Sequence, residues 1–119
     1  MILDLNAMSS EYIDLNDAVS RIGGNFALYK RLLGRFLEGN HYEEIERALQ
    51  GGDSEEAARQ VHSLKGVSAN LSLTKIRSIS VELEQLIKEN ADYSSCLDGL
   101  KLAFTETTDK IAEIMNREE

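Results

Sequence analysis

The chain has 119 residues, of which 42% are hydrophobic and 29% are charged, and its formal net charge is −8. This composition suits one globular domain with a modest core and argues against an intrinsically disordered chain. A surface this acidic repels nucleic-acid phosphates, so the composition also disfavours a DNA- or RNA-binding protein.

The chain contains no proline, and its glycines cluster between stretches that have helical periodicity. Residues 1–11 show no clear period, and we expect them to form an N-terminal arm, ordered or disordered, ahead of a single domain at residues 12–117. The first stretch of the domain, "DLNDAVSR", predicts a short helix that is closed by Gly23 and Gly24. Asn25 is then placed to cap the next helix.

Longer amphipathic segments follow this short helix. Apolar residues recur at helical spacing over residues 26–49, and we expect Gly39 and Asn40 to kink this segment or to break it briefly. Further helices are expected at residues 54–72, 76–89 and 97–114.

Short connections between long amphipathic helices predict an all-α fold, an antiparallel up-down four-helix bundle with a short extra N-terminal helix. No convincing run alternates with a period of two, so strands are not expected. The one cysteine, Cys96, excludes an internal disulfide and a cysteine metal cluster, and we interpret it as a structural residue. The sequence contains no long apolar run or signal-like start, so we expect a cytoplasmic protein without membrane insertion, and a monomer is the simplest assembly.

The helix at residues 54–72 carries the candidate site. Its apolar side chains fall on one face of a helical wheel, and His62 points to the opposite, solvent-facing side. Around the histidine lie a cation, Lys65, and three small residues, Ala58, Gly66 and Ala69. A glycine inside a helix costs about 1 kcal/mol relative to alanine, and an exposed position gains nothing from it unless another molecule comes close. The pattern therefore predicts an open imidazole with room for a visiting molecule.

An open imidazole of this kind has two interpretations. It is either a solvated histidine on an ordinary helix or a nucleophile. A histidine is largely neutral at pH 7, so one ring nitrogen offers a lone pair that can accept a phosphoryl group. Lys65 would then offset the negative charge of the phosphoryl oxygens, and the open surroundings would allow in-line transfer.

The segment "HSLKGVSANL" resembles the signature of the histidine-containing phosphotransfer (HPt) domain family, which runs His, any residue, Leu-Lys-Gly, small residues and Leu. The resemblance extends over "YIDLNDAVSRIGGNFALYKRLLGRFLEGN" and "IRSISVELEQLIKE", so that it covers Tyr12 to Met115. One departure is Ser72, which stands where the family commonly has a glycine at the end of the histidine helix and could alter the turn after Leu71.

The resemblance implies a role for each residue of the motif. His62 would be the phosphorylated histidine, Lys65 the lysine beside it, and Gly66 the glycine that admits the partner. Such a protein accepts a phosphoryl group from a receiver aspartate or a sensor or hybrid histidine kinase, and passes it to another receiver. It is a phosphocarrier rather than a stand-alone enzyme, it has no cofactor of its own, and the Mg²⁺ needed for transfer sits in the receiver.

Several residues are candidates for the surface on which a response-regulator receiver docks. Besides Gly66 these are Ala58, Arg59, Ala69 and Glu84. Arg59 could meet an acidic rim on the receiver or pair with Glu55 or Glu56 of its own helix. Glu82 and Glu84 could face the histidine across a groove and fix which imidazole nitrogen reacts, or could belong to a solvated acidic face.

Two other classes of function compete with phosphotransfer. Glu38 lies three residues before His41, as in di-iron bundles, but a metal site of that type needs a second such pair, and His62 has Arg59 at the matching position. We therefore expect no metal site and interpret His41 as a surface or kink residue. The other competitor is a helical adaptor without chemistry, in which replacing His62 would change nothing.

Overall fold

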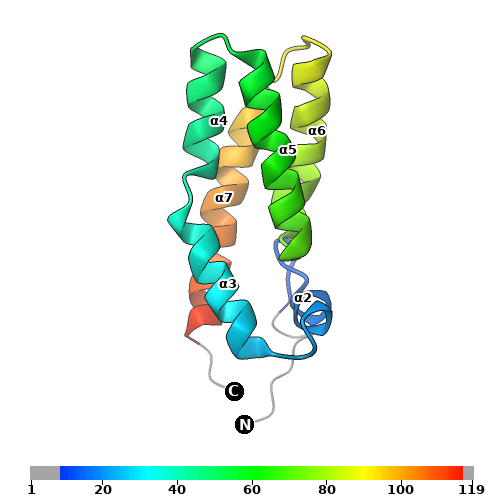
Figure 1. Cartoon of the computed structure of the whole chain (residues 1–119), viewed down its shortest axis with the longest axis vertical. Coiled ribbons are helices and arrows are strands. Elements are labelled where there is room, and N and C mark those ends of the chain that lie inside the picture. Colours follow the sequence, from blue (N-terminus) through cyan, green and yellow to red (C-terminus); the bar gives the residue numbers. More distant parts are fainter. Residues whose placement is uncertain (1–8, 117–119) are drawn as a thin grey trace.

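The computed structural model describes residues 9–116. Most of the expected N-terminal arm, residues 1–8, and the last residue of the expected domain, residue 117, lie outside the described residues. The helices are α2 (Leu15–Arg21), α3 (Phe26–Glu38), α4 (His41–Gln50), α5 (Ser54–Asn70), α6 (Thr74–Lys88) and α7 (Ser94–Met115) (Figure 1). No strand occurs within the described range, and the predicted all-α class is confirmed.

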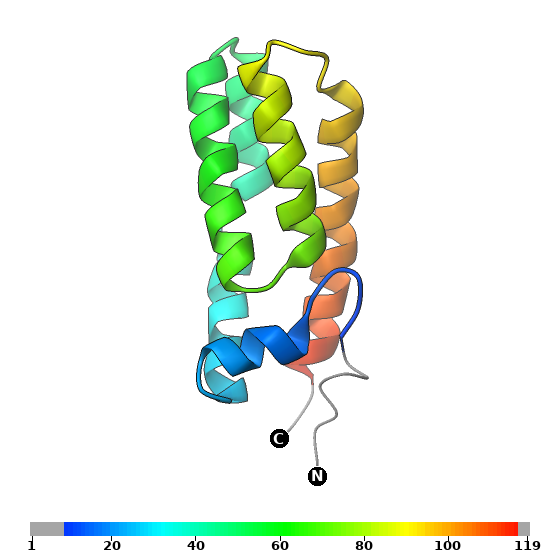
Figure 2. The ribbon, with the colours of Figure 1, turned by 90° about the vertical axis from the view of Figure 1, so that its right-hand side faces the viewer.

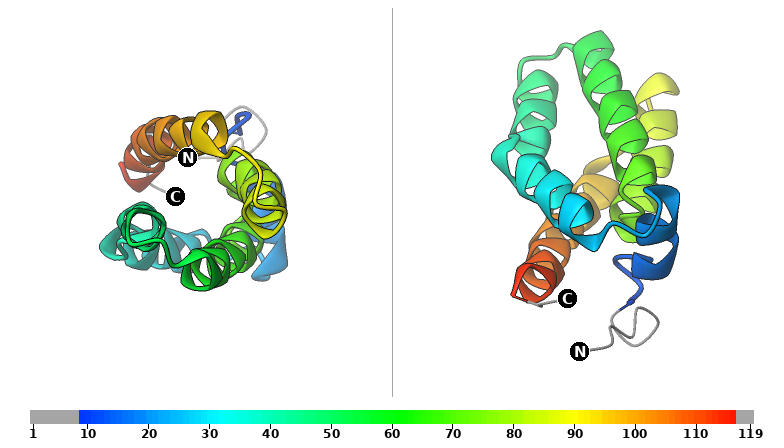
Figure 3. Two further views of the ribbon diagram at one scale, coloured as in Figure 1. Left: turned by 90° about the horizontal axis from the view of Figure 1, so that it is seen from above. Right: turned by 60° about the horizontal axis from the view of Figure 1, so that its bottom comes forward.

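The long helices run alternately up and down around one core. Helix α5 packs against α4 on one side and α6 on the other, and α7 closes the ring against α6, α4 and α3 (Figure 3). The short α2 lies across one end of the bundle, next to α3 (Figure 2). Within the part of the chain that the structure describes, no helix combines the length and apolarity needed to cross a membrane.

Side-chain caps explain why three of the helices begin where they do. The side chains of Asp14, Asn25 and Asp53 accept hydrogen bonds from backbone N–H groups in the first turns of α2, α3 and α5. Each bond satisfies a donor that has no partner inside the helix. The predicted cap at Asn25 is therefore confirmed.

The core is built from the apolar faces of all the helices. Its largest fully buried side chains include Tyr29, Leu33, Ile45, Leu64, Ile76, Leu83, Leu100 and Ile111. The buried hydroxyl of Tyr29 keeps a hydrogen-bond partner, because Oη donates to the carbonyl of Leu71 at 2.7 Å. This bond ties α3 to the end of α5. Of the residues predicted for the core face of α5, Val67 is only partly buried.

The turn after α5 accommodates Ser72 in place of the glycine that the HPt resemblance implies. Ser72 has a φ of 54°, in the left-handed region that glycine adopts at low cost. Its hydroxyl donates to Asp17 Oδ2 at 2.6 Å, and its carbonyl accepts from the N–H of Asp14 at 3.0 Å. The serine therefore joins this turn to α2 and offsets the backbone strain with hydrogen bonds.

The expected interruption near Gly39 is a full break between α3 and α4. Gly39 is extended, with φ −81° and ψ 151°, and the His41 ring stacks on Phe36 with 4.7 Å between ring centroids. A Cβ on Gly39 would lie 2.6 Å from His41 Nε2, so a side chain at this position would displace the ring. The interpretation of His41 as a kink residue thus has a physical basis, since its ring covers the break.

We expect His41 to make folding stability depend on pH. Burial lowers the pKa of His41 below 6.5, although its hydrogen bond with the Phe36 backbone and the charge of Glu43 oppose this shift. The folded protein therefore disfavours the protonated ring, while the unfolded chain protonates it normally. The stability that His41 contributes should be fully present above about pH 6.5 and decrease as the pH falls below that value.

The test compares urea unfolding of the wild type and His41→Gln at about pH 7.5 and about pH 5.5, on either side of the ordinary histidine pKa. The difference in the free energy of unfolding between the two proteins should shrink at the lower pH. A difference that is the same at both pH values would show that titration of His41 does not matter to the fold.

Candidate functional site

His62 lies in the middle of α5 with its side chain 69% exposed, on the face that the helical periodicity predicts. Its ring is anchored on one side only. Nδ1 lies 3.0 Å from Oε2 of Glu84, a residue of the neighbouring helix α6. Helices α5 and α6 run side by side over their whole length (Figure 2), which brings together two residues that are 22 positions apart.

Glu84 is the buried centre of the site, with its side chain only 7% exposed. Lys65 Nζ donates to its Oε1 at 2.7 Å. Lys88 Nζ lies 3.3 Å from Oε2, the oxygen that also faces His62. The carboxylate is therefore held by one residue on its own helix and two on α5, as a buried charge requires.

These contacts keep Glu84 ionised. Burial by itself raises the pKa of Glu84, but hydrogen bonds from Lys65, Lys88 and His62 outweigh it, and the pKa lies below 4.5. An ionised carboxylate can only accept hydrogen bonds. The proton of a neutral His62 ring must therefore sit on Nδ1, which leaves the lone pair on Nε2. Among residues 9–116, no hydrogen-bond partner contacts Nε2.

The neighbours of His62 on the outer face of α5 have small side chains and leave the ring open to solvent. Gly66 is exposed, and a Cβ added to it would meet nothing within 4 Å. Ala58 and Ala69 are partly buried and small. No internal packing requires the glycine, so the protein's own fold gives no reason for the helix-weakening residue at this place.

The other residues predicted for the site differ in how they are placed relative to His62. Arg59 is 70% exposed and donates to Glu56 Oε2 through Nε at 3.0 Å, which is the intrahelical pairing considered from the sequence. Glu82 is exposed on α6, whereas Glu84 faces His62, so the interpretation of Glu84 as part of a solvated acidic face is wrong. Lys65 does not stand free but turns toward Glu84, with its side chain 32% exposed.

The sequence reasoning missed Lys88. Its position four residues after Glu84 on the same helix was the available signal, since residues at that spacing are neighbours on a helix surface. Within residues 9–116, no three His, Cys, Asp or Glu side chains come together in a way that could hold a metal ion.

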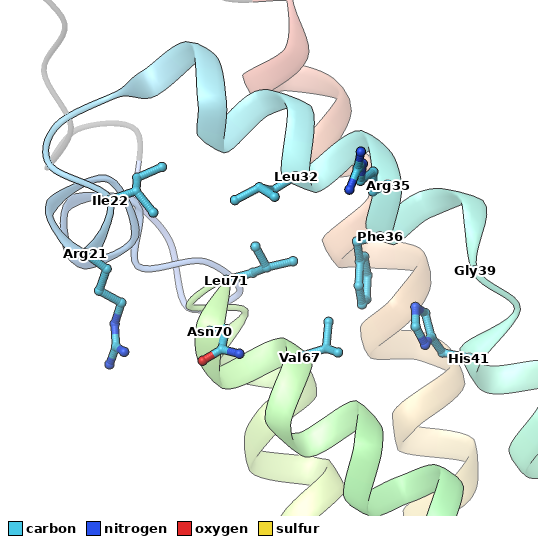
Figure 4. A pocket seen from close by; sticks show the side chains of 10 residues that line it. All are labelled: Arg21, Ile22, Leu32, Arg35, Phe36, Gly39, His41, Val67, Asn70 and Leu71. Carbon is cyan, nitrogen blue, oxygen red and sulfur yellow. The ribbon is translucent and has the colours of Figure 1, made fainter.

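A groove of about 740 Å³ lies at the C-terminal end of α5 (Figure 4). Arg21 and Arg35 line it from α2 and α3, but only Arg21 has an ion-pair partner among the described residues, Asp17 at 2.9 Å. Asn70 and His41 also line it. The apolar residues of the groove come from three segments and are Ile22, Leu32, Phe36, Val67 and Leu71. The groove and the exposed His62 are thus both built on α5.

Comparison with protein families gives one result. The model of the Hpt domain matches residues 31–115, which is well over half of the chain and contains His62, Lys65, Glu84 and Lys88. Comparisons with curated proteins and with solved structures gave no match.

Replacing Glu84 should change the proton position on His62. In Glu84→Gln the neutral amide is a weaker acceptor and loses its ionic contacts with both lysines, so we expect a smaller fraction of the Nδ1–H tautomer. Nitrogen-15 NMR of the imidazole, recorded at about pH 8, measures this fraction. We also expect the free energy of unfolding to fall by roughly 1–3 kcal/mol, because charged hydrogen bonds to a buried group are lost.

Glu82→Gln is the matched control, since it removes the same charge from an exposed position of the same helix. It should leave the tautomer fraction and the stability almost unchanged. If Glu84→Gln also leaves the tautomer fraction at the wild-type value, Glu84 does not determine the protonation of His62.

Proposed function

Because this chain belongs to the Hpt domain family, we propose that it is a phosphorelay intermediate of a two-component system. Its family acts in phosphotransfer in two-component signalling. In the proposed relay, His62 accepts a phosphoryl group from a receiver aspartate or from a histidine kinase and passes it to the aspartate of another receiver.

The observation that carries this proposal is the state of the His62 ring. The ring is mostly exposed, its Nδ1 is held 3.0 Å from a buried, ionised carboxylate, and its Nε2 has no partner among the described residues. A solvated histidine without function needs none of this arrangement. A phosphoryl acceptor needs all of it, because the attacking nitrogen must have a free lone pair and a fixed direction.

The proposed transfer is a displacement at phosphorus. The Nε2 lone pair attacks the phosphorus of the aspartyl phosphate, an N–P bond forms, and the P–O bond to the aspartate breaks. The aspartate leaves as a carboxylate with the bonding electron pair, and the ring, which keeps its Nδ1 proton, becomes positively charged. In the second step a carboxylate oxygen of the next receiver attacks the same phosphorus, and the N–P electrons return to Nε2.

Glu84 and Lys65 support both directions of this reaction. Glu84 accepts the hydrogen bond from Nδ1, so its negative charge stabilises the ring when it becomes positive. Lys65, three residues after His62, supplies a positive charge near the phosphoryl oxygens. Mg²⁺ would be brought by the receiver, and the proposal assigns no cofactor to this chain.

The receiver is proposed to dock over α5. Ala58, Gly66 and Ala69 would provide the clearance it needs to reach Nε2, and Arg59 would lie at the edge of the contact. The groove at the C-terminal end of α5 offers apolar contacts and a cation, Arg35, which has no ion-pair partner among residues 9–116 (Figure 4). A cytoplasmic location and a monomeric state remain predictions that accompany this proposal.

Incubation with a phosphorylated receiver domain tests the function directly. Wild-type protein should gain phosphate that is labile in acid and stable in alkali, and His62→Gln should gain none. His41→Gln replaces the other histidine of the chain and keeps His62, so it should still gain phosphate with the same acid and alkali stability, which identifies the labelled histidine. Equal labelling of His62→Gln and the wild type would reject the proposal, and partner binding without any labelling would favour the helical adaptor.

Gly66→Ala should change the stability of the protein and its rate of phosphoryl transfer in opposite directions. Because a Cβ at Gly66 meets nothing within 4 Å, the variant should be more stable by about 0.5–1 kcal/mol, as for other glycines inside exposed helices. Transfer from a receiver should nevertheless slow down, about tenfold or more, because the added methyl occupies the space in which the receiver approaches.

Gly99→Ala on α7 provides the control, since a Cβ at Gly99 also meets nothing within 4 Å. This variant should gain similar stability and transfer phosphate at the wild-type rate. If Gly66→Ala also transfers at the wild-type rate, Gly66 does not serve as clearance for the partner.

A further inference from the structure

We propose that Lys88 is a positioning residue of the phosphoryl site, which holds the Glu84 carboxylate toward His62 and supplies a second positive charge. This inference rests on the proposed function and extends it to a residue outside the histidine helix. Lys88 is the last residue of α6, and its Nζ lies 3.3 Å from Glu84 Oε2.

The arrangement of the two lysines around Glu84 is asymmetric. Lys65 occupies Oε1 at 2.7 Å, while Lys88 shares Oε2 with Nδ1 of His62. Lys88 is thus the cation that contacts the oxygen directed at the histidine. Its side chain is 59% exposed, whereas that of Lys65 is 32% exposed, so Lys88 has the greater freedom to adjust when charge arrives.

The charge balance of the site gives Lys88 a role that Lys65 alone does not fill. One lysine is enough to neutralise Glu84. With two lysines and a neutral ring, the cluster carries an excess of one positive charge before transfer. Phosphorylation places a charge of about −2 on the phosphoryl oxygens and makes the ring positive, so His62 gains a net negative charge that the second lysine offsets. Lys88 Nζ and His62 Nδ1 lie 3.3 Å and 3.0 Å from the same Glu84 oxygen, and the screening length is about 8 Å at physiological salt, so the attraction is only partly screened.

A simpler explanation makes the Glu84–Lys88 contact an ordinary pair four residues apart on a helix surface, which stabilises the helix slightly. That explanation predicts an effect on stability and none on phosphate chemistry. The two explanations can be separated because α6 carries another exposed lysine, Lys75, at the opposite end of the helix, where no contact with Glu84 occurs.

The experiment compares the wild type with K88Q, K88R and K75Q. Phosphoramidate, a small chemical phosphoryl donor, removes any effect of receiver docking, and a phosphorylated receiver domain is used in parallel. We expect K88Q to form phosphohistidine about threefold more slowly or worse, and its rate to depend less on salt. K88R, which keeps the charge, should restore the wild-type rate. K75Q should behave like the wild type, although it changes the net charge equally.

A second measurement shows whether Lys88 positions Glu84 against His62 or only stabilises the helix. Nitrogen-15 NMR of unphosphorylated protein should show a lower fraction of the Nδ1–H tautomer of His62 in K88Q than in K75Q. If the wild type is labelled on His62 but K88Q matches K75Q in rate and tautomer, the role of Lys88 is overturned and the proposed function stands. If neither donor labels His62 in the wild type, the proposed function and this inference are both overturned.

Discussion

A buried carboxylate needs partners, and the arrangement of the site follows from how Glu84 finds them. Only 7% of the Glu84 side chain is exposed, so burying its ionised carboxylate without ionic hydrogen bonds would strongly destabilise the fold. Lys65 and His62 supply two from α5, and Lys88 supplies the third from α6. The same contacts also determine the chemistry of the site. The ionised carboxylate sets the tautomer of His62, and the two lysines set the local charge.

On the exposed side of the site, by contrast, the side chains make few contacts. A globular protein gains stability by covering apolar surface and by using good helix formers, yet α5 leaves an imidazole largely in water beside a glycine that contacts nothing. The buried carboxylate therefore holds Nδ1 of the ring, while the other side of the ring stays exposed to solvent. Such a combination suits a group that is reached by another macromolecule and that must present one nitrogen in a defined direction.

Two local departures from regular helix geometry shape the groove at the C-terminal end of α5. The break at Gly39 turns α4 away from α3 and lets His41 stack on Phe36 beside the groove. At the other end of the groove, Ser72 adopts a left-handed conformation and joins the end of α5 to α2 through Asp17. Gly39 lines the groove, and Ser72 forms the turn after Leu71, which also lines it; neither Gly39 nor Ser72 belongs to the reacting groups.

The sequence by itself determined the helical class, the positions of the helices, the Asn25 cap, the break near Gly39 and the outward direction of His62. All of these depend on local rules, because a helix repeats every 3.6 residues and its caps lie next to its ends. The periodicity could not decide whether Glu84 faced solvent or the histidine, and it left Lys88 without a role. Contacts between helices depend on their rotation, axial offset and separation, which are set by how the whole core packs. Only the tertiary structure placed Glu84 of α6 against His62 of α5 and so fixed which nitrogen of the ring is free.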